Sequence, residues 1–314
     1  QAGKLDQGTK SVAIGYTAGC DDQGYYSVAI GNGAAKLDQG QYSVAIGDEA
    51  ACDNQGNYSV AVGHKAAHNA QGQHSVAIGY FAGSADQSYS SVAIGVSAGK
   101  ASQSYSSVAI GDGAGMNQQA ENSVAVGAYA GCGDQANACV AVGYRAGCSG
   151  QSIGAVAVGF QAGCTGQESY AVAIGTSAGS TGQNASSVAI GVDSGRDDQG
   201  NFCVAVGREA GETNQHNNTV VISALGTALN TNGTNRFFVK KIRLNSGTLN
   251  WSSGTGEVYA NTSDDRVKHN ETYIRNALRT IMKLKPQTYD KSPDLESNTY
   301  IERHESGLMV QDIW

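Results

Sequence analysis

The chain has 314 residues, a formal net charge of −7, and 43 glycines but only 2 prolines. The scarcity of proline and the lack of a Gly-X-Y period exclude collagen, and a hydrophobic share of 40% against 15% charged residues argues against disorder. No apolar run is long enough to span a bilayer and no basic stripe is present, so we expect neither membrane insertion nor a nucleic-acid partner.

A short motif recurs through the first two thirds of the chain. Ser-Val-Ala-Ile-Gly at 11–15 returns, with small variations, every 16 residues until a degraded copy at 219–223, which makes fourteen copies without insertion or deletion. A glutamine recurs at the same interval from Gln7 to Gln215. A constant period of this length identifies a repeat protein.

The period predicts the fold of residues 1–223. Sixteen residues are too few for helix-pair repeats, whereas Val-Ala-Ile has the composition of a short strand and the remainder of each unit consists of turn formers. One unit cannot bury an apolar face, but stacked units can. We therefore predict an all-β fold, a parallel β-solenoid with one coil per repeat.

The alternation within the strand suggests which side chains face inward. We expect Val12, Ile14 and their equivalents to fill the coil, and Ser11, Ala13 and Gly15 to form a flat outer face, on which Ala109 would lie. A thin interior and an outer face of alanine and glycine both favour association of several chains, so we predict an oligomer.

Repeated Ser-Val-Ala-Ile-Gly followed by an Ala-Gly pair resembles the head of trimeric autotransporter adhesins of the YadA type. The resemblance covers residues 1–223. It implies a left-handed parallel β-roll, and it implies that three rolls assemble into a homotrimer.

Cysteine and glutamine each occupy fixed positions in the coil. The glutamines are expected to form a structural stack of hydrogen-bonded amides. Cys132, Cys148 and Cys164 follow one another in three consecutive coils. Such a column could bind a soft metal or form one disulfide, but free stacked thiols are favoured, and no Cys-x-x-Cys spacing indicates zinc. We expect no metal and no cofactor.

Aromatic residues gather at the turns. Tyr16, Tyr80, Tyr144 and Phe160 share the position after the strand glycine, and other tyrosines precede the strand. The first four are candidate binding residues for a receptor or glycan. The alternative is that the rings cover gaps between protomers.

The sixteen-residue repeat ends at residue 223, and the sequence pattern changes there. Three short strands are predicted within 236–243, 248–251 and 256–259, and we expect 224–262 to form a β-rich neck intertwined among three chains. A helix is expected over 273–284, ended by Pro286, with a strand or turn at 287–290.

Ser263-Asp-Asp-Arg-Val-Lys268 before this helix, with Leu284-Lys-Pro and Gly307-Leu-Met-Val-Gln-Asp after it, resembles the intramolecular chaperone of tailspikes, endosialidases and viral fibres. The resemblance covers 263–314 and implies an α+β domain that trimerises a fibre and then cuts itself off. Mapped here, the cut falls between Thr262 and Ser263, with Ser263 as nucleophile and Lys268 as base. The chain ends just after the last motif, so we expect a truncated chaperone; self-cleavage would require the complete domain.

These features predict a homotrimeric fibre, or adhesin, that attaches a virion to a host receptor or glycan and is displayed on the virion surface. A bacterial surface adhesin is one alternative. A glycan-cleaving tailspike is another, but the acidic residues cluster at turns such as Asp21-Asp22 rather than as a paired catalytic site. We therefore expect no enzyme that acts on an external substrate.

Overall fold

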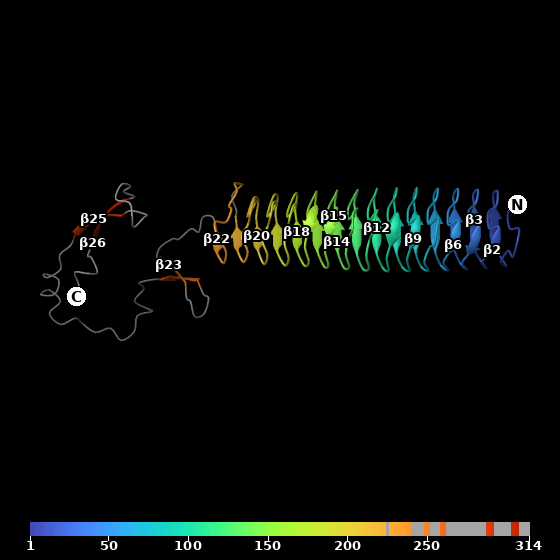
Figure 1. The fold of residues 1–314 in the computed structure, drawn as a ribbon, viewed down its shortest axis with the longest axis horizontal. Coiled ribbons are helices and arrows are strands. Elements are labelled where there is room, and N and C mark those ends of the chain that lie inside the picture. Colours follow the sequence, from blue (N-terminus) through green and yellow to red (C-terminus); the bar gives the residue numbers. More distant parts are fainter. Residues whose placement is uncertain (224–225, 240–247, 252–257, 262–286, 292–302, 308–314) are drawn as a thin grey trace, which may run out of the picture. The chain divides into compact units, whose positions relative to one another are not determined.

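The computed structural model describes residues 1–223, 226–239, 248–251, 258–261, 287–291 and 303–307. The chain divides into two units, Gln1–Ile242 and Arg243–Trp314. The first unit is an elongated stack of coils, with one main-sheet strand in each coil (Figure 1). The predicted all-β parallel solenoid is thus confirmed.

The main sheet contains 15 parallel strands, fourteen of which are the Val-Ala-Ile segments of the repeat. Each pairs in register with the next coil, so that Val92 lies opposite Val108 and Ala93 opposite Ala109. The strands are β1 (Val12–Ile14), β3 (Val28–Ile30), β5 (Val44–Ile46), β7 (Val60–Val62), β8 (Val76–Ile78), β10 (Val92–Ile94), β12 (Val108–Ile110), β13 (Val124–Val126), β14 (Val140–Val142), β16 (Val156–Val158), β18 (Val172–Ile174), β19 (Val188–Ile190), β20 (Val204–Val206), β21 (Val220–Ile222) and β22 (Phe237–Val239).

A second strand position ends at the repeated glutamine and forms the other wall of the coil. It is regular in three short parallel sheets and continues between them as isolated parallel bridges, such as Gln103 with Gln119. The strands here are β2 (Asp21–Gln23), β4 (Leu37–Gln39), β6 (Asp53–Gln55), β9 (Ala85–Gln87), β11 (Ala101–Gln103), β15 (Ser149–Gln151) and β17 (Thr165–Gln167).

The interior is built from the small residues, and our assignment of the two strand faces was wrong. Ala109 is fully buried, as are its equivalents in the other coils from Ala29 to Ala205, whereas Ile110 is 37% exposed. The serine of the motif also faces inward, and Ser107 donates a hydrogen bond of 2.6 Å to the carbonyl oxygen of Ser104. The two walls leave room for alanine, serine and glutamine, so the branched side chains point outward.

The glycine that closes each strand permits the next coil to approach. Gly111 has a φ of 129°, and a Cβ on it would lie 2.7 Å from the carbonyl carbon of Gly127. Any side chain there would collide with backbone, which accounts for glycine at this position.

The main sheet extends past the last recognisable repeat. β22 pairs with β21 through Val220 opposite Phe237, a spacing of seventeen residues instead of sixteen. Leu229 forms a parallel bridge with Ala210. The segment after 223 thus supplies one further, slightly longer coil, and the first of the three strands predicted there belongs to the roll.

Among the described residues of the second unit, two antiparallel strand pairs are present. β23 (Thr248–Trp251) pairs with β24 (Val258–Asn261). Strands were predicted at 248–251 and 256–259, in agreement with these positions. β25 (Gln287–Lys291) pairs with β26 (Arg303–Gly307); the first was expected as a strand or turn and the second was not expected. The helix predicted over 273–284 lies outside the described residues.

Candidate functional site

An apolar stripe runs along the outside of the main sheet. It consists of the first and third residues of each strand, valine followed by isoleucine or valine, which are half-buried or exposed in every coil from β3 to β21. Ile78, Ile110, Ile174 and Ile190 are each 37–39% exposed. We call this stripe the Val/Ile face. An uninterrupted apolar surface of this length marks a site of protein association.

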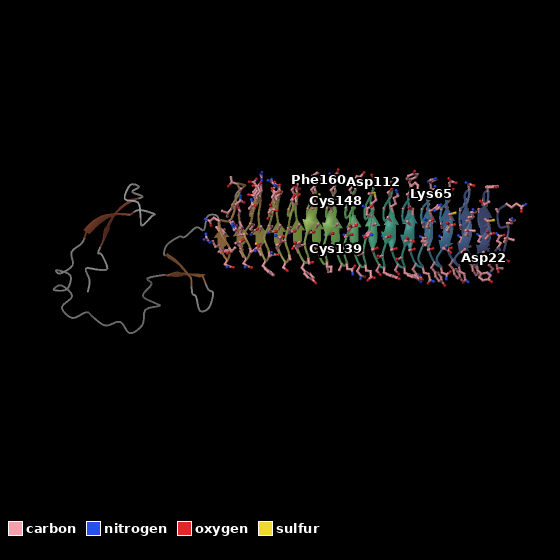
Figure 2. The ribbon with its side chains drawn as sticks, viewed as in Figure 1. Asp22, Lys65, Asp112, Cys139, Cys148 and Phe160 are labelled. Carbon is pink, nitrogen blue, oxygen red and sulfur yellow. The ribbon has the colours of Figure 1, made fainter. Side chains whose placement is uncertain are left out.

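The four predicted binding residues are exposed at the turn after the strand glycine. Tyr16 is 74% exposed and Tyr80 is 52% exposed. Tyr144 stacks on Phe160 with ring centroids 5.3 Å apart, whereas Tyr80 stacks on His64 at 5.2 Å. The structure therefore places Tyr80 in a different aromatic pair from Tyr144 and Phe160, and does not bring the four residues into one cluster. Figure 2 labels Phe160 on the same edge of the roll as Asp112 and Lys65, which lie in other coils.

A longer aromatic ladder lies at the turn before the strand. Tyr26, Tyr42 and Tyr58 stack with centroid spacings of 5.1 Å and nearly parallel planes, and His74 continues the stack at 5.2 Å. The sixteen-residue spacing could have revealed this ladder, because equal positions in stacked coils lie one above the other. The inner rings have neighbours on both faces, so they offer edges and hydroxyl groups to a partner rather than open ring faces.

The cysteine column contains one close pair. The Sγ atoms of Cys132 and Cys148 lie 2.7 Å apart, and Cys132 Sγ is 3.4 Å from the carbonyl oxygen of Cys148. Burial and the hydrogen bond with Cys148 raise the pKa of Cys132 to about 12. Burial also raises the pKa of Cys164. Within the described part of the chain all seven cysteines are free thiols, as the sequence favoured.

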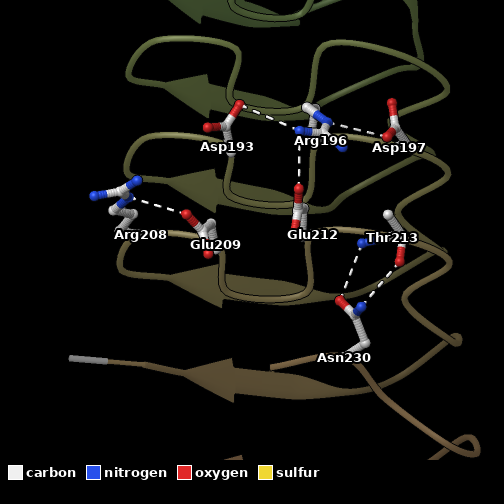
Figure 3. Close-up of polar contacts among 8 residues, drawn as sticks. All are labelled: Asp193, Arg196, Asp197, Arg208, Glu209, Glu212, Thr213 and Asn230. Atoms are coloured by element: carbon white, nitrogen blue, oxygen red, sulfur yellow. Dashed lines mark hydrogen bonds and ion pairs between the residues drawn. The ribbon is translucent and has the colours of Figure 1, made fainter. Parts of the chain in front are cut away.

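Charged side chains connect the last coils of the roll (Figure 3). The Arg196 guanidinium contacts Glu212 at 2.8 Å, Asp197 at 3.0 Å and Asp193 at 3.7 Å. In the next coils, Asn230 accepts from the backbone amide of Thr213 and donates to its hydroxyl group, at 3.0 and 2.9 Å. The contacts of Arg196 join two sixteen-residue coils, and those of Asn230 attach the longer final coil. We assign both a structural role.

The predicted catalytic residues Ser263 and Lys268 lie outside the described residues. Across the ranges that the structure describes, no group of three or more metal-ligating side chains could hold a metal ion. The same ranges contain no helix of the length and apolarity that a membrane span requires.

Comparison with known families agrees with both resemblances. Residues 39–66 and 55–82 match the YadA head domain repeat in two overlapping copies, and residues 263–314 match the chaperone of endosialidase. No curated protein and no solved structure matched the chain. The chain is a fibrous β-roll protein that combines adhesin-type head repeats with a C-terminal chaperone segment, and both families self-associate as trimers.

Proposed function

We propose that this protein is a homotrimeric attachment fibre, carried on a virion surface, in which three parallel rolls pack through their Val/Ile faces. The observation that carries the proposal is the length of this face. It extends over fourteen coils in register, with isoleucines still more than one third exposed in the single chain. Exposed apolar area of this extent is stabilised by burial against an identical surface.

The thin interior supports the same proposal. The buried apolar residues of the roll are almost all alanines, with few larger side chains. Alanine buries little apolar area, so the hydrophobic stabilisation of a single roll is small relative to the surface that the roll exposes. Three rolls that share their valines and isoleucines would have the larger core that the single chain lacks.

The aromatic surfaces would carry attachment. Tyr144 and Phe160 are 44% and 49% exposed, and exposed aromatic pairs at a turn are suited to a glycan or to a receptor loop. Replacing both rings by alanine should weaken binding of the roll to a glycan array or to host cells. The matched control is Tyr170→Ala, which removes a ring that is 65% exposed in another turn.

The C-terminal segment would drive assembly and then be released. In this proposal the hydroxyl oxygen of Ser263 attacks the carbonyl carbon of Thr262 while Lys268 accepts the hydroxyl proton. The bond to the Ser263 nitrogen breaks as that nitrogen takes up the proton, and water then hydrolyses the resulting ester. A desolvated lysine can remain neutral and serve as such a base.

Trimer formation can be tested by light scattering on the roll. The wild type should have the mass of three protomers, and the variant Ile78→Glu with Ile110→Glu should dissociate because both positions face outward. Ser102→Asp is the matched control: Ser102 is an exposed residue on β11, the opposite wall of the coil, and Asp86 occupies the equivalent position one coil earlier.

Circular dichroism separates dissociation from unfolding in this test, since the glutamate variant should retain β-structure. A wild-type roll that is a stable monomer would contradict the proposal. So would a double glutamate variant that keeps the trimer mass.

A further inference from the structure

We propose that Cys132 and Cys148 form an oxidation site, at which a small-molecule disulfide converts the two thiols into a disulfide that links adjacent coils of the roll. The proposal is independent of attachment and of the trimer. It rests on the position of two thiols in one column, on access to them, and on a cation beside them.

The geometry of the roll brings the two sulfur atoms together. Cys132 and Cys148 occupy the same position in consecutive coils, at the turn that follows β13 and β14, and their Sγ atoms are 2.7 Å apart. Main-sheet strands pair in exact register on either side, Val124 with Val140 and Val140 with Val156. Parallel neighbours are separated by a strand spacing that lies within the Cα range of disulfides. The bond can therefore form without moving the coils.

The pair is reachable from solvent. Cys132 is half-buried and Cys148 is buried, and both line a surface pocket together with Tyr129, Tyr144 and Arg145. Figure 2 places Cys148 toward the edge that carries Phe160, whereas Cys139 lies toward the other edge of the roll. Cys139 is fully buried and its Sγ is 2.8 Å from the carbonyl oxygen of Ser152, so it serves as an internal comparison.

The residues around the two sulfur atoms indicate which thiol attacks the oxidant first. Arg145 lies beside Cys148. A hydrogen bond with the Cys148 side chain is the main reason that the pKa of Arg145 is raised. A cation stabilises the thiolate that attacks a disulfide. Cys132, in contrast, stays a thiol, because burial raises its pKa to about 12. Cys148 is the more buried of the two thiols, so we place the first attack on it because it lies beside the Arg145 cation in the same pocket and not because of its exposure.

The chemistry balances as thiol–disulfide exchange. The Cys148 thiolate attacks one sulfur of the oxidant, the oxidant's S–S bond breaks, and one small thiol leaves with a proton. Cys132 then attacks the Cys148 sulfur, expels the second small thiol and gives up its proton to it. One oxidant disulfide is reduced to two thiols, and the two protein thiols are oxidised to one disulfide.

The test is peptide mapping after treatment of the reduced chain with oxidised glutathione. Trypsin cuts after Lys100, Arg145 and Arg196, with no lysine or arginine between them, so Cys132 and Cys148 fall on separate peptides. Each of these peptides contains a second cysteine, Cys139 or Cys164. The experiment therefore uses the background Cys139→Ser with Cys164→Ser, substitutions that copy the serines of other coils, Ser123 and Ser180.

We expect the two peptides to be joined through Cys132 and Cys148, with the loss of two hydrogen atoms, and to separate on reduction. Adding Cys132→Ser should abolish the joined species and leave a glutathione adduct on Cys148. Non-reducing electrophoresis should show the oxidised protein at the mobility of one chain.

Three results would overturn the proposal. Recovery of Cys132 and Cys148 unlinked, as free thiols or as separate adducts, would show that the pair does not close. Linkage in the wild type through Cys164 instead of Cys132 would show that the wrong pair was identified. A covalent dimer on the gel would show that the bond joins different chains.

Discussion

The side-chain amide nitrogen of Gln167 donates a hydrogen bond of 2.9 Å to the carbonyl oxygen of Val156, eleven residues earlier on the opposite wall of the same coil. Its Oε1 accepts from Gln151 in the preceding coil, and its amide also reaches Gln183 in the next one, each at 3.0 Å. One side chain thus ties together both walls of its own coil and three successive coils. This bonding explains how an interior of alanine and serine remains ordered.

Replacing a buried glutamine should therefore be costly. Gln119 is fully buried, donates to the carbonyl oxygen of Val108 at 2.9 Å and accepts from Gln103 at 3.2 Å. Gln119→Leu has a similar size but leaves these groups without partners, which should cost about 2–4 kcal/mol per chain. The adjacent Gln118 is exposed, so Gln118→Leu is the control. Denaturant unfolding of both variants checks the prediction, and equal midpoints would contradict it.

Enlarging an interior alanine should also destabilise the roll. Ala109 is fully buried, and Ala109→Val should cost about 1–3 kcal/mol because the two walls must move apart. Ala128→Val is the control, since Val96 and Val192 occupy the same position in other coils. We expect its effect to stay within about 0.5 kcal/mol. Thermal unfolding of the two variants measures the difference, and a neutral Ala109→Val would mean that the interior has spare room.

The Cys52 thiol should react slowly and with a displaced pH dependence. Burial and the neighbouring Asp53 carboxylate raise the pKa of Cys52 to about 11, and only the thiolate is alkylated. In the native chain the rate with iodoacetamide should rise about tenfold for each pH unit and level off only near pH 11, whereas in the denatured chain it should level off near pH 9.

The Asp53→Asn variant tests the cause of this shift. Removing the negative charge should lower the pKa of Cys52 and accelerate labelling at neutral pH, with peptide mapping used to follow Cys52 alone. If the variant and the wild type label at the same rate, Asp53 does not act on the thiol.

Self-cleavage should depend on one hydroxyl group and one amine. Ser263→Ala should abolish release of the fragment that begins at residue 263, and Lys268→Arg should do the same because guanidinium does not give up its proton. Both variants should still form trimers, since folding precedes the cut. Mass spectrometry reads out the fragment, and its release from Ser263→Ala would refute the assignment.

The period predicted the solenoid, the register and the glutamine stack, because equal spacing places equal residues above one another. It did not predict which strand face is buried. Alternation places Val108 and Ile110 on one face of the strand and Ala109 on the other, but it does not say which face points into the coil. The width of the coil decides which face is buried. That width depends on the two turns and on the wall that carries Gln119. Stacking of Tyr26 on Tyr42 was accessible from the period, whereas the short distance between Cys132 and Cys148 required side-chain positions.

The final coil shows the limit of pattern reading. Phe237 pairs with Val220 at seventeen residues, so neither the motif nor the period marks it as part of the roll. Its attachment depends on contacts that have no counterpart in the repeat, such as those between Asn230 and Thr213.

The strict register of the main sheet makes every coil a compatible neighbour for every other. The upper edge of one repeat presents the same backbone groups and the same glycine contact as the upper edge of any other, so removing or adding sixteen residues leaves both new neighbours matched, whereas a shift of one residue would turn each strand over. Adding or removing one repeat would therefore change the length of the roll by one coil and leave its two ends unchanged. Length is therefore a property that duplication of a repeat can change without disturbing the pairing between coils.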